Sequence, residues 1–506
     1  MVGMSRDVPM RVAVIGAGIA GIAAGVNLKK AGIEDFTIFD KADGIGGTWF
    51  FNSYPGAACD VDSTLYSYSF HLKKRWSRRY ATQPEILQYL NDVVDRFVLR
   101  SKLALGTGVQ SCRYDESQNI WILTTEQGSE HQFDAVISCL GMLNDPLIPN
   151  IPGLETFPGI VTHTARWPKD LAVKSQRIAL VGTGSSAAQI VPAIVPEVES
   201  LHLFQRQPGW VLPKPDKDHG SQLAGTGGIA TKLSRLWQYL RREMAHGKYD
   251  MGSRRNVHQK MLAIDFIANS IHDPALREAV TPSYPFGCKR AVRDSNFYAS
   301  LSEDNVVVVP EALARVDGSV VIGSGGQRAE VDIIVLATGF RAQDFLGTME
   351  IVGLGGQTLA ETWEVAGGPE AFLGVSVPDF PNFFIAYGPN SNTATTSMVF
   401  VLERQIEHIV RCLAYVRRRG LRGIAVKRET HYRFNRWLQG SINDTVWTAG
   451  CNNYFRSASG KVVTNWPHTS IAYAALLRVM HPLMPGVYQK VVAGDRSARQ
   501  PVHEQD

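Results

Sequence analysis

Two glycine-rich turns constrain the fold of this 506-residue chain more than any other feature. Each turn follows a short apolar run and precedes a stretch of helical character. The first run, residues 11–15, leads into the motif of residues 16–21 (GAGIAG); the second, residues 177–181, leads into residues 182–187 (GTGSSA). A strand, a tight turn and a helix in this order predict a parallel α/β unit. The sequence therefore predicts an α/β fold with two such units.

In the first unit, an acidic residue follows the second strand. Residues 36–39 (FTIF) form the expected strand, and Asp40 follows it about 20 residues after the glycines, the usual spacing. Gly16, Gly18 and Gly21 would let backbone N–H groups approach a pyrophosphate, while Asp40 accepts from a ribose hydroxyl. A glycine turn alone fits any α/β protein, but the turn, the helix and the acid together predict a dinucleotide site.

The second unit carries the opposite charge at the matching place. Its second strand, residues 201–204 (LHLF), is followed by Arg206. An arginine there suits the 2′-phosphate of NADP, which a carboxylate would repel. An ordinary surface arginine is the alternative interpretation.

A glycine- and aromatic-rich loop after Asp40 distinguishes this chain from a simple dehydrogenase. Residues 44–49 (GIGGTW) and 54–70 (YPGAACDVDSTLYSYSF) stand where such an enzyme would have an amphipathic helix. The loop could lie along a long cofactor such as FAD; a buried aromatic cluster is the alternative. Two sites of different polarity predict a flavoprotein that uses FAD and NADPH, either a reductase or a monooxygenase.

The order of these motifs predicts two Rossmann-like domains. Residues 1–145 would begin the FAD-binding domain, 146–335 would form the NADP-binding domain, and 336–506 would complete the first, ending in a polar tail. The proline-rich residues 146–152 resemble a linker. A helical insertion at about 213–285, a candidate substrate cap, carries apolar residues at helical spacing: Leu233, Leu236, Trp237, Leu240 and Met244.

Composition limits the kinds of partner, location and cysteine chemistry that we expect for this protein. The net charge of +5 comes from dispersed residues, which argues against nucleic acid binding. No long apolar stretch predicts a membrane span or signal peptide, so we expect a cytoplasmic protein. The six cysteines form no CxxC pair and no Cys/His ligand pattern. The sequence therefore predicts neither a disulfide framework, nor a metal site, nor the dithiol of a flavin disulfide reductase. It indicates no oligomeric state.

The segment of residues 157–168 (FPGIVTHTARWP) lies between the two units and is expected to be a shaped loop. It resembles the FxGxxxHxxxWP fingerprint of type I Baeyer–Villiger monooxygenases. The GGTW sequence, the 54–70 loop, Lys289-Arg290, the ATGF of residues 337–340 and the VWTAGC of residues 446–451 also resemble that family. N- and S-oxygenating flavin monooxygenases have a similar fingerprint without this Trp-Pro ending.

The resemblance implies an activity. NADPH would reduce FAD, reduced flavin would react with O2, and a C4a-peroxyflavin would convert a ketone to an ester or lactone. Sulfides are a further expected substrate class. Two other readings stay open: an N- or S-oxygenating monooxygenase, and a nucleotide-binding protein without catalysis. The ketone itself cannot be read from the loops expected to line its pocket, at 54–70, 140–147, 285–300, 388–397 and 440–455.

The resemblance also implies residue roles. Arg290 would be the catalytic cation, oriented by Asp60, while Lys289 would join Arg206 at the phosphate and Trp447 would pack near the nicotinamide. His163 and Trp167 would couple the domains. Two positions depart from the family: Ala58, where arginine is frequent, and the turn at Cys139. The predicted cofactor-binding residues are Gly16, Gly18, Gly21, Asp40, Gly47, Thr48, Trp49, Asp60, Tyr66, Val109, Gly182, Thr183, Gly184, Ser185, Ser186, Gln189, Arg206, Lys289 and Trp447.

Overall fold

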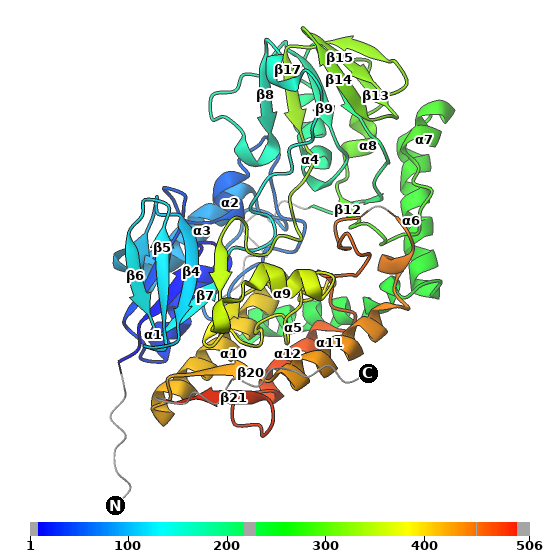
Figure 1. The fold of residues 1–506 in the computed structure, drawn as a ribbon. Helices are drawn as coiled ribbons and strands as arrows, with labels where there is room; N and C mark the ends of the chain where they lie inside the picture. The colour runs from blue at the N-terminus through cyan, green and yellow to red at the C-terminus, as the bar shows by residue number, and fades with distance from the viewer. Residues whose placement is uncertain (1–8, 217–228, 452, 493–506) are drawn as a thin grey trace, which may run out of the picture.

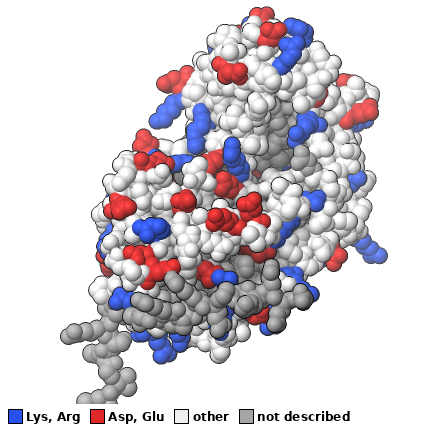
Figure 2. Space-filling model, in the orientation of Figure 1, with Lys and Arg blue, Asp and Glu red and all other residues white. Residues whose placement is uncertain are grey.

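The computed structural model describes residues 9–216, 229–451 and 453–492. Two parallel sheets dominate it and lie in different parts of the molecule (Figure 1). The predicted polar tail lies largely in 493–506, outside the described residues. Charged residues of both signs are interspersed over the face shown in Figure 2.

The first sheet has the strand order β19-β7-β1-β2-β3, and all of its neighbouring strands are parallel. Every residue of β1 and β7 is buried, which explains why both read as continuous apolar runs. β19 comes from late in the chain, so the chain returns to this sheet after building the second. The strands are β1 (Val12–Ile15), β2 (Phe36–Phe39), β3 (Leu103–Ala104), β7 (Ala135–Ser138) and β19 (Phe383–Ile385).

Helices cover the first sheet. α1 packs against the long helix α10, whose N-terminus is capped by the Ser397 hydroxyl. The sequence pattern Thr82-x-x-Glu85 at the start of α3 is typical of a capping box, but none forms: Thr82 makes no side-chain cap, and Glu85 accepts from Lys73 and Ser77. The helices are α1 (Ile19–Lys30), α2 (Thr48–Phe51), α3 (Gln83–Arg96), α9 (Leu359–Val365), α10 (Met398–Arg419), α11 (Arg428–Ile442) and α12 (Ser470–Val479).

Smaller sheets flank this unit. A four-stranded sheet has the order β18-β4-β5-β6, and β20 pairs with β21 near the end of the described chain. Their strands are β4 (Val109–Asp115), β5 (Ile120–Thr125), β6 (Glu130–Phe133), β18 (Glu350–Val352), β20 (Gly423–Val426) and β21 (Tyr488–Val491).

The second parallel sheet has the order β13-β10-β9-β17-β8. Its edge strand β8 lies inside the segment expected to be a loop, so that expectation is wrong for residues 160–163. Ile160 and Val161 are exposed, as edge positions allow, and pairing with β17 supplies the strand's hydrogen bonds. The strands and helix are β8 (Ile160–His163), β9 (Arg177–Val181), β10 (Ser200–Phe204), β13 (Val306–Val309), β17 (Ile333–Leu336) and α4 (Ser185–Ile194).

The remaining elements of this part of the chain are short strands, a short helix and the helices of the insertion. The three strands after β13 form a separate antiparallel sheet, and β11 pairs with β12. These elements are α5 (Ile229–Met244), α6 (Arg254–Ser270), α7 (Pro274–Val280), α8 (Phe297–Ser300), β11 (Val211–Leu212), β12 (Val292–Arg293), β14 (Leu313–Asp317), β15 (Val320–Gly323) and β16 (Arg328–Glu330).

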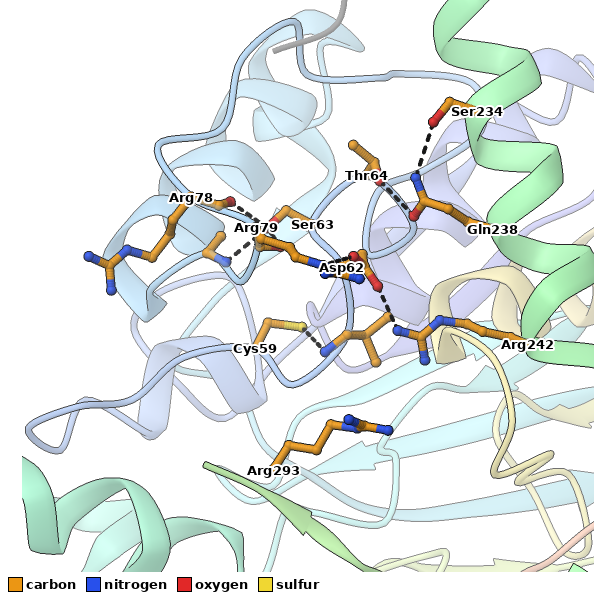
Figure 3. A network of polar contacts seen from close by, with 12 residues as sticks. Cys59, Asp62, Ser63, Thr64, Arg78, Arg79, Ser234, Gln238, Arg242 and Arg293 are labelled. Atoms are coloured by element: carbon orange, nitrogen blue, oxygen red, sulfur yellow. Dashed lines mark hydrogen bonds and ion pairs between the residues drawn. The ribbon is translucent and has the colours of Figure 1, made fainter. Parts of the chain in front are cut away.

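The predicted helical insertion divides between the two parts of the molecule. Ala263 and Ile267 of α6 are buried in the core that contains the second sheet. Helix α5 instead contacts the loop after α2. Arg242 pairs with Asp62 (Figure 3), and Arg235 donates to the carbonyl of Thr64. The insertion therefore bridges the two units. No described helix is long and apolar enough to cross a bilayer.

Candidate active site

The first glycine turn is shaped by close backbone contacts. Gly16 has φ +110°, and a Cβ there would lie 2.6 Å from the carbonyl oxygen of Cys139. A Cβ on Gly21 would lie 1.8 Å from the carbonyl oxygen of Gly16. No described side chain caps the N-terminus of α1 at Gly18. The helix dipole and uncapped N–H groups make this turn suitable for a pyrophosphate.

Asp40 stabilises the same turn by hydrogen bonds to its own carboxylate. Its Oδ2 accepts from the backbone N–H of Ala17 at 2.7 Å and its Oδ1 from that of Ala42 at 2.9 Å. Burial raises the pKa of Asp40, although these N–H groups and Lys41 oppose the rise. The carboxylate also borders the cavity that Arg290 lines, where its remaining lone pairs can accept from ribose hydroxyls.

The glycine-rich loop after Asp40 closes over the first turn. A Cβ on Gly47 would lie 3.1 Å from the Cα of Gly18, so the two turns meet through bare backbone. Trp49 Nε1 donates to the Tyr66 hydroxyl at 3.0 Å, and their rings meet edge to face. A cavity runs from these turns past the 54–66 loop to Arg290. The predicted site residues that line it are Gly16, Gly18, Asp40, Gly47, Thr48, Trp49, Asp60, Tyr66, Val109, Ser185, Gln189, Arg290 and Trp447.

Arg290 and Asp60 form an ion pair across 230 positions of sequence, through Nη2 and Oδ2. The charge of Asp60 raises the pKa of Arg290, with burial opposing it. Burial alone would raise the pKa of Asp60, but Arg290 outweighs that effect and the pKa is lowered. The Arg290 side chain remains 48% exposed and borders the cavity. Arg290 therefore presents a permanent positive charge to whatever occupies that cavity.

Tyrosines around Arg290 were not singled out by the sequence. Tyr249, Tyr387 and Tyr454 line the same cavity, and the Tyr249 ring lies 5.4 Å from that of Trp447. Burial raises the pKa of Tyr387 and of Tyr454, so both phenols are neutral at neutral pH. Tyr454 falls in a loop expected to line the pocket, whereas Tyr249 and Tyr387 lie outside all the expected loops.

The second glycine turn resembles the first in geometry. Gly182 has φ +117°, and a Cβ there would lie 2.4 Å from the carbonyl oxygen of Ala337. Gly184 differs, since a Cβ on it would meet no described atom within 4 Å. It precedes α4, whose N-terminus no described side chain caps. This turn therefore offers both open space and backbone N–H groups that no described side chain caps. It also contains Thr183, Ser185 and Ser186.

Gln189 on α4 joins the second unit to the flavin loop. Its Nε2 donates to the Ala58 carbonyl at 2.9 Å, and its Oε1 accepts from the Tyr54 hydroxyl at 3.0 Å. A Cβ on Gly56 would lie 2.4 Å from the Gln189 carbonyl oxygen. Gln189, a predicted cofactor-binding residue, thus also holds the two units together. At Ala58 its hydrogen bond is made to the backbone carbonyl and not to the side chain.

Arg206 and Lys289 lie together beyond β10. Burial lowers the pKa of Lys289, and the positive charge of Arg206 lowers it further. Lys289 Nζ donates to Gln207 Oε1 at 2.7 Å. Among the described residues, neither cation forms an ion pair with a carboxylate within 4.0 Å. Two cations this close, without a carboxylate between them, suit a phosphate.

The fingerprint segment lies where the two units meet. His163 is 4% exposed; its Nδ1 accepts from the Ala165 N–H at 3.1 Å, and its ring contacts Phe340 edge to face. Trp167 is buried in the core of the second unit. Arg166, which no sequence pattern singles out, places its guanidinium 4.2 Å from the ring centroid of Phe51 on α2.

Burial lowers the pKa of His163 to about 4, so its imidazole is neutral at working pH. We expect His163→Ala to lower turnover roughly 10- to 100-fold, because a misplaced interface misaligns distant reacting groups. Bound FAD should be retained, and the substitution should leave the shape of the pH profile of kcat unchanged from about pH 5 to 8, because the imidazole of His163 is neutral throughout that range. Flavin absorbance, turnover and the ratio of product to NADPH consumed test this. Normal turnover with normal coupling would contradict it.

One disulfide joins Cys288 to Cys451. It links the segment that carries Arg290 to the one that carries Trp447. The sequence predicts no disulfide framework and gives no sign of this one pairing, because the two positions are 163 residues apart. The other four cysteines are free and buried. Among the described residues, no group of three or more His, Cys, Asp or Glu side chains could hold a metal ion.

Comparisons with known proteins agree with this geometry. A family model described as flavin-binding monooxygenase-like matches residues 9–348. A Baeyer–Villiger monooxygenase of Streptomyces coelicolor is 39% identical, over 97% of this chain and 96% of that protein. One of Pseudomonas aeruginosa is 37% identical, over 92% of this chain and 89% of that protein.

Solved structures give the same result. The crystal structure of cyclohexanone monooxygenase from Rhodococcus sp. Phi1 bound to NADP+ superposes with a TM-score of 0.86 at 29% identity, covering 96% of this chain and 99% of that chain. The fold class and the resemblance found in the sequence are confirmed. The chain belongs to the flavin-binding monooxygenase-like family and, within it, to the Baeyer–Villiger monooxygenases.

Proposed function

We propose that this enzyme uses FAD, NADPH and O2 to insert one oxygen atom beside a ketone carbonyl, giving an ester or lactone, and that it also oxidises sulfides. The observation that carries the proposal is the Arg290–Asp60 ion pair. It borders the cavity that also reaches the first glycine turn and Ser185 at the start of α4. A permanent cation thus faces the space where both cofactor sites converge.

The residues fit both cofactors. Gly16, Gly18 and Asp40 would hold the adenosine diphosphate part of FAD, and Trp49 and Tyr66 would border its flavin end. Residues 182–186 would hold the pyrophosphate of NADPH, with Arg206 and Lys289 at its 2′-phosphate. When bound, the flavin supplies the activated oxygen and NADPH the reducing equivalents. We propose residues 1–145 and 336–506 as the FAD-binding domain and 146–335 as the NADP-binding domain.

Arg290 would act by electrostatic stabilisation. Negative charge develops on the ketone oxygen when the carbonyl is attacked, and a guanidinium can donate two N–H groups to it. An arginine stays protonated at any working pH, so this charge needs no proton transfer. Asp60 would position the guanidinium by accepting from Nη2, which leaves its other donors free.

The tyrosines would complete the pocket. Neutral Tyr387 and Tyr454 supply apolar ring surface and hydroxyl groups without a competing anion near Arg290. Where the pocket excludes water, the positive charge of Arg290 interacts more strongly with a developing negative charge, because a lower local dielectric screens the interaction less. The cytoplasm, which supplies reduced nicotinamide cofactor, is the proposed location.

Product analysis tests the proposal against N- or S-oxygenation alone. The purified FAD-loaded enzyme would be incubated with NADPH, O2 and a panel of cyclic, linear and aryl ketones, sulfides and amines. We expect esters or lactones from at least one ketone and sulfoxides from sulfides. Amine oxidation with no ester from any ketone would overturn it.

A further inference from the structure

Helix α5 is bound to the rest of the protein through its polar side. Arg235 Nη2 donates to the carbonyl of Ser67 at 2.8 Å, and Arg242 Nη2 pairs with Asp62 Oδ2 at 2.7 Å. Glu243 accepts from the Ser470 hydroxyl and is 8% exposed. Figure 3 shows Gln238 and Arg242 of this helix directed at the loop around Asp62. Three charged residues of α5, Arg235, Arg242 and Glu243, therefore face the protein.

The opposite side of α5 is apolar and exposed. The residues of this stripe recur at helical spacing, and each is between 44% and 65% exposed: Leu233 59%, Leu236 54%, Trp237 59%, Leu240 44% and Met244 65%. In a helix of a soluble protein such a stripe faces the core. Single exposed apolar residues need no explanation, but a continuous stripe marks an interaction site.

The rim of the stripe is cationic. Lys232 and Arg241 are the exposed charged residues of α5, since its only acid, Glu243, is buried. The Arg241 guanidinium lies 5.5 Å from the Trp237 ring centroid. A tryptophan- and leucine-bearing stripe beside lysine and arginine has the chemistry of a helix that lies in a membrane interface.

We propose that α5 binds the surface of an anionic lipid bilayer, lying in its plane with Leu233, Leu236, Trp237, Leu240 and Met244 inserted between the headgroups. The cations of the rim favour this occupant over a second copy of the chain, because two copies would bring two positive rims together. Arg242, on the inner side of the same helix, lines the same cavity as Arg290. Binding therefore places the cavity beside the lipid, where apolar compounds concentrate.

Vesicle flotation of the FAD-loaded full-length enzyme tests the proposal without any turnover. We expect the enzyme to float with vesicles of phosphatidylcholine containing about one third phosphatidylglycerol, and much less with pure phosphatidylcholine. Trp237→Gln with Leu240→Gln should lower bound protein at least about tenfold. Lys232→Gln with Arg241→Gln should remove the preference for anionic vesicles.

The matched control is Val365→Gln, which replaces an apolar residue that is 89% exposed on α9, outside α5. It should float like the parent enzyme. Circular dichroism and FAD content would show that each variant is folded. Absence of flotation by the parent, or equal flotation of the Trp237/Leu240 variant, would overturn the proposal. Self-association that this variant abolishes, without vesicle binding, would show that a second copy covers the stripe.

Discussion

Replacing Arg290 by alanine should abolish ester formation while leaving the enzyme yellow and reducible by NADPH. The removed guanidinium is the cation we assign to the charge that develops on the ketone oxygen, and losing one such donor typically costs about 100- to 1000-fold in kcat. Asp60 would also lose its ion-pair partner, so that only the charges of Lys214 and Arg293 would offset its carboxylate beside the cavity. The measurements are ester yield per NADPH consumed, the rate of anaerobic flavin reduction and hydrogen peroxide release.

Arg290→Lys separates charge from geometry. Lysine keeps the positive charge but loses the planar fork, so we expect an activity between those of the parent and Arg290→Ala. Asp60→Asn, which keeps a hydrogen-bond acceptor without the charge, should lower activity less than Arg290→Ala if Asp60 only positions the guanidinium. Full ester formation by Arg290→Ala would refute the role assigned to Arg290, although it would leave the proposed reaction itself intact.

Arg206→Ala should raise KM for NADPH roughly 10- to 100-fold, because a hydrogen bond to a charged group contributes about 1.5–3 kcal/mol. KM for NADH, which lacks the 2′-phosphate, should change little. Lys289→Ala should act in the same direction, since the two cations lie close enough for the charge of one to lower the pKa of the other. Steady-state kinetics with both cofactors measure the change in preference.

Lys169→Ala provides a control, because Lys169 is an exposed cation on the loop after the fingerprint segment and is not part of the proposed 2′-phosphate site. It should leave both KM values unchanged. An equal rise in KM for NADPH and NADH in Arg206→Ala would mean that Arg206 does not contact the 2′-phosphate.

The two glycine turns could be predicted from the sequence because they depend on local backbone requirements. Gly16 and Gly182 have positive φ and carbonyl groups beside them, so the glycines mark turns whatever surrounds them. The strands β1 and β9 also read as apolar runs, because strands inside a parallel sheet are covered on both faces. Patterns without such a requirement were less reliable: Thr82 does not cap α3, and β8 is a strand because β17 lies beside it.

The sequence by itself determined the two glycine turns, the opposite charges of Asp40 and Arg206 that follow them, and the family. Only the tertiary structure decided which distant residues meet. It paired Arg290 with Asp60 and Cys288 with Cys451, and it gathered Tyr249, Tyr387 and Tyr454 around one cavity. It also turned the apolar side of α5 outward, because the helix's arginines found partners on the protein. Periodicity reports that a helix has two faces, whereas the partners available in three dimensions decide which face is buried.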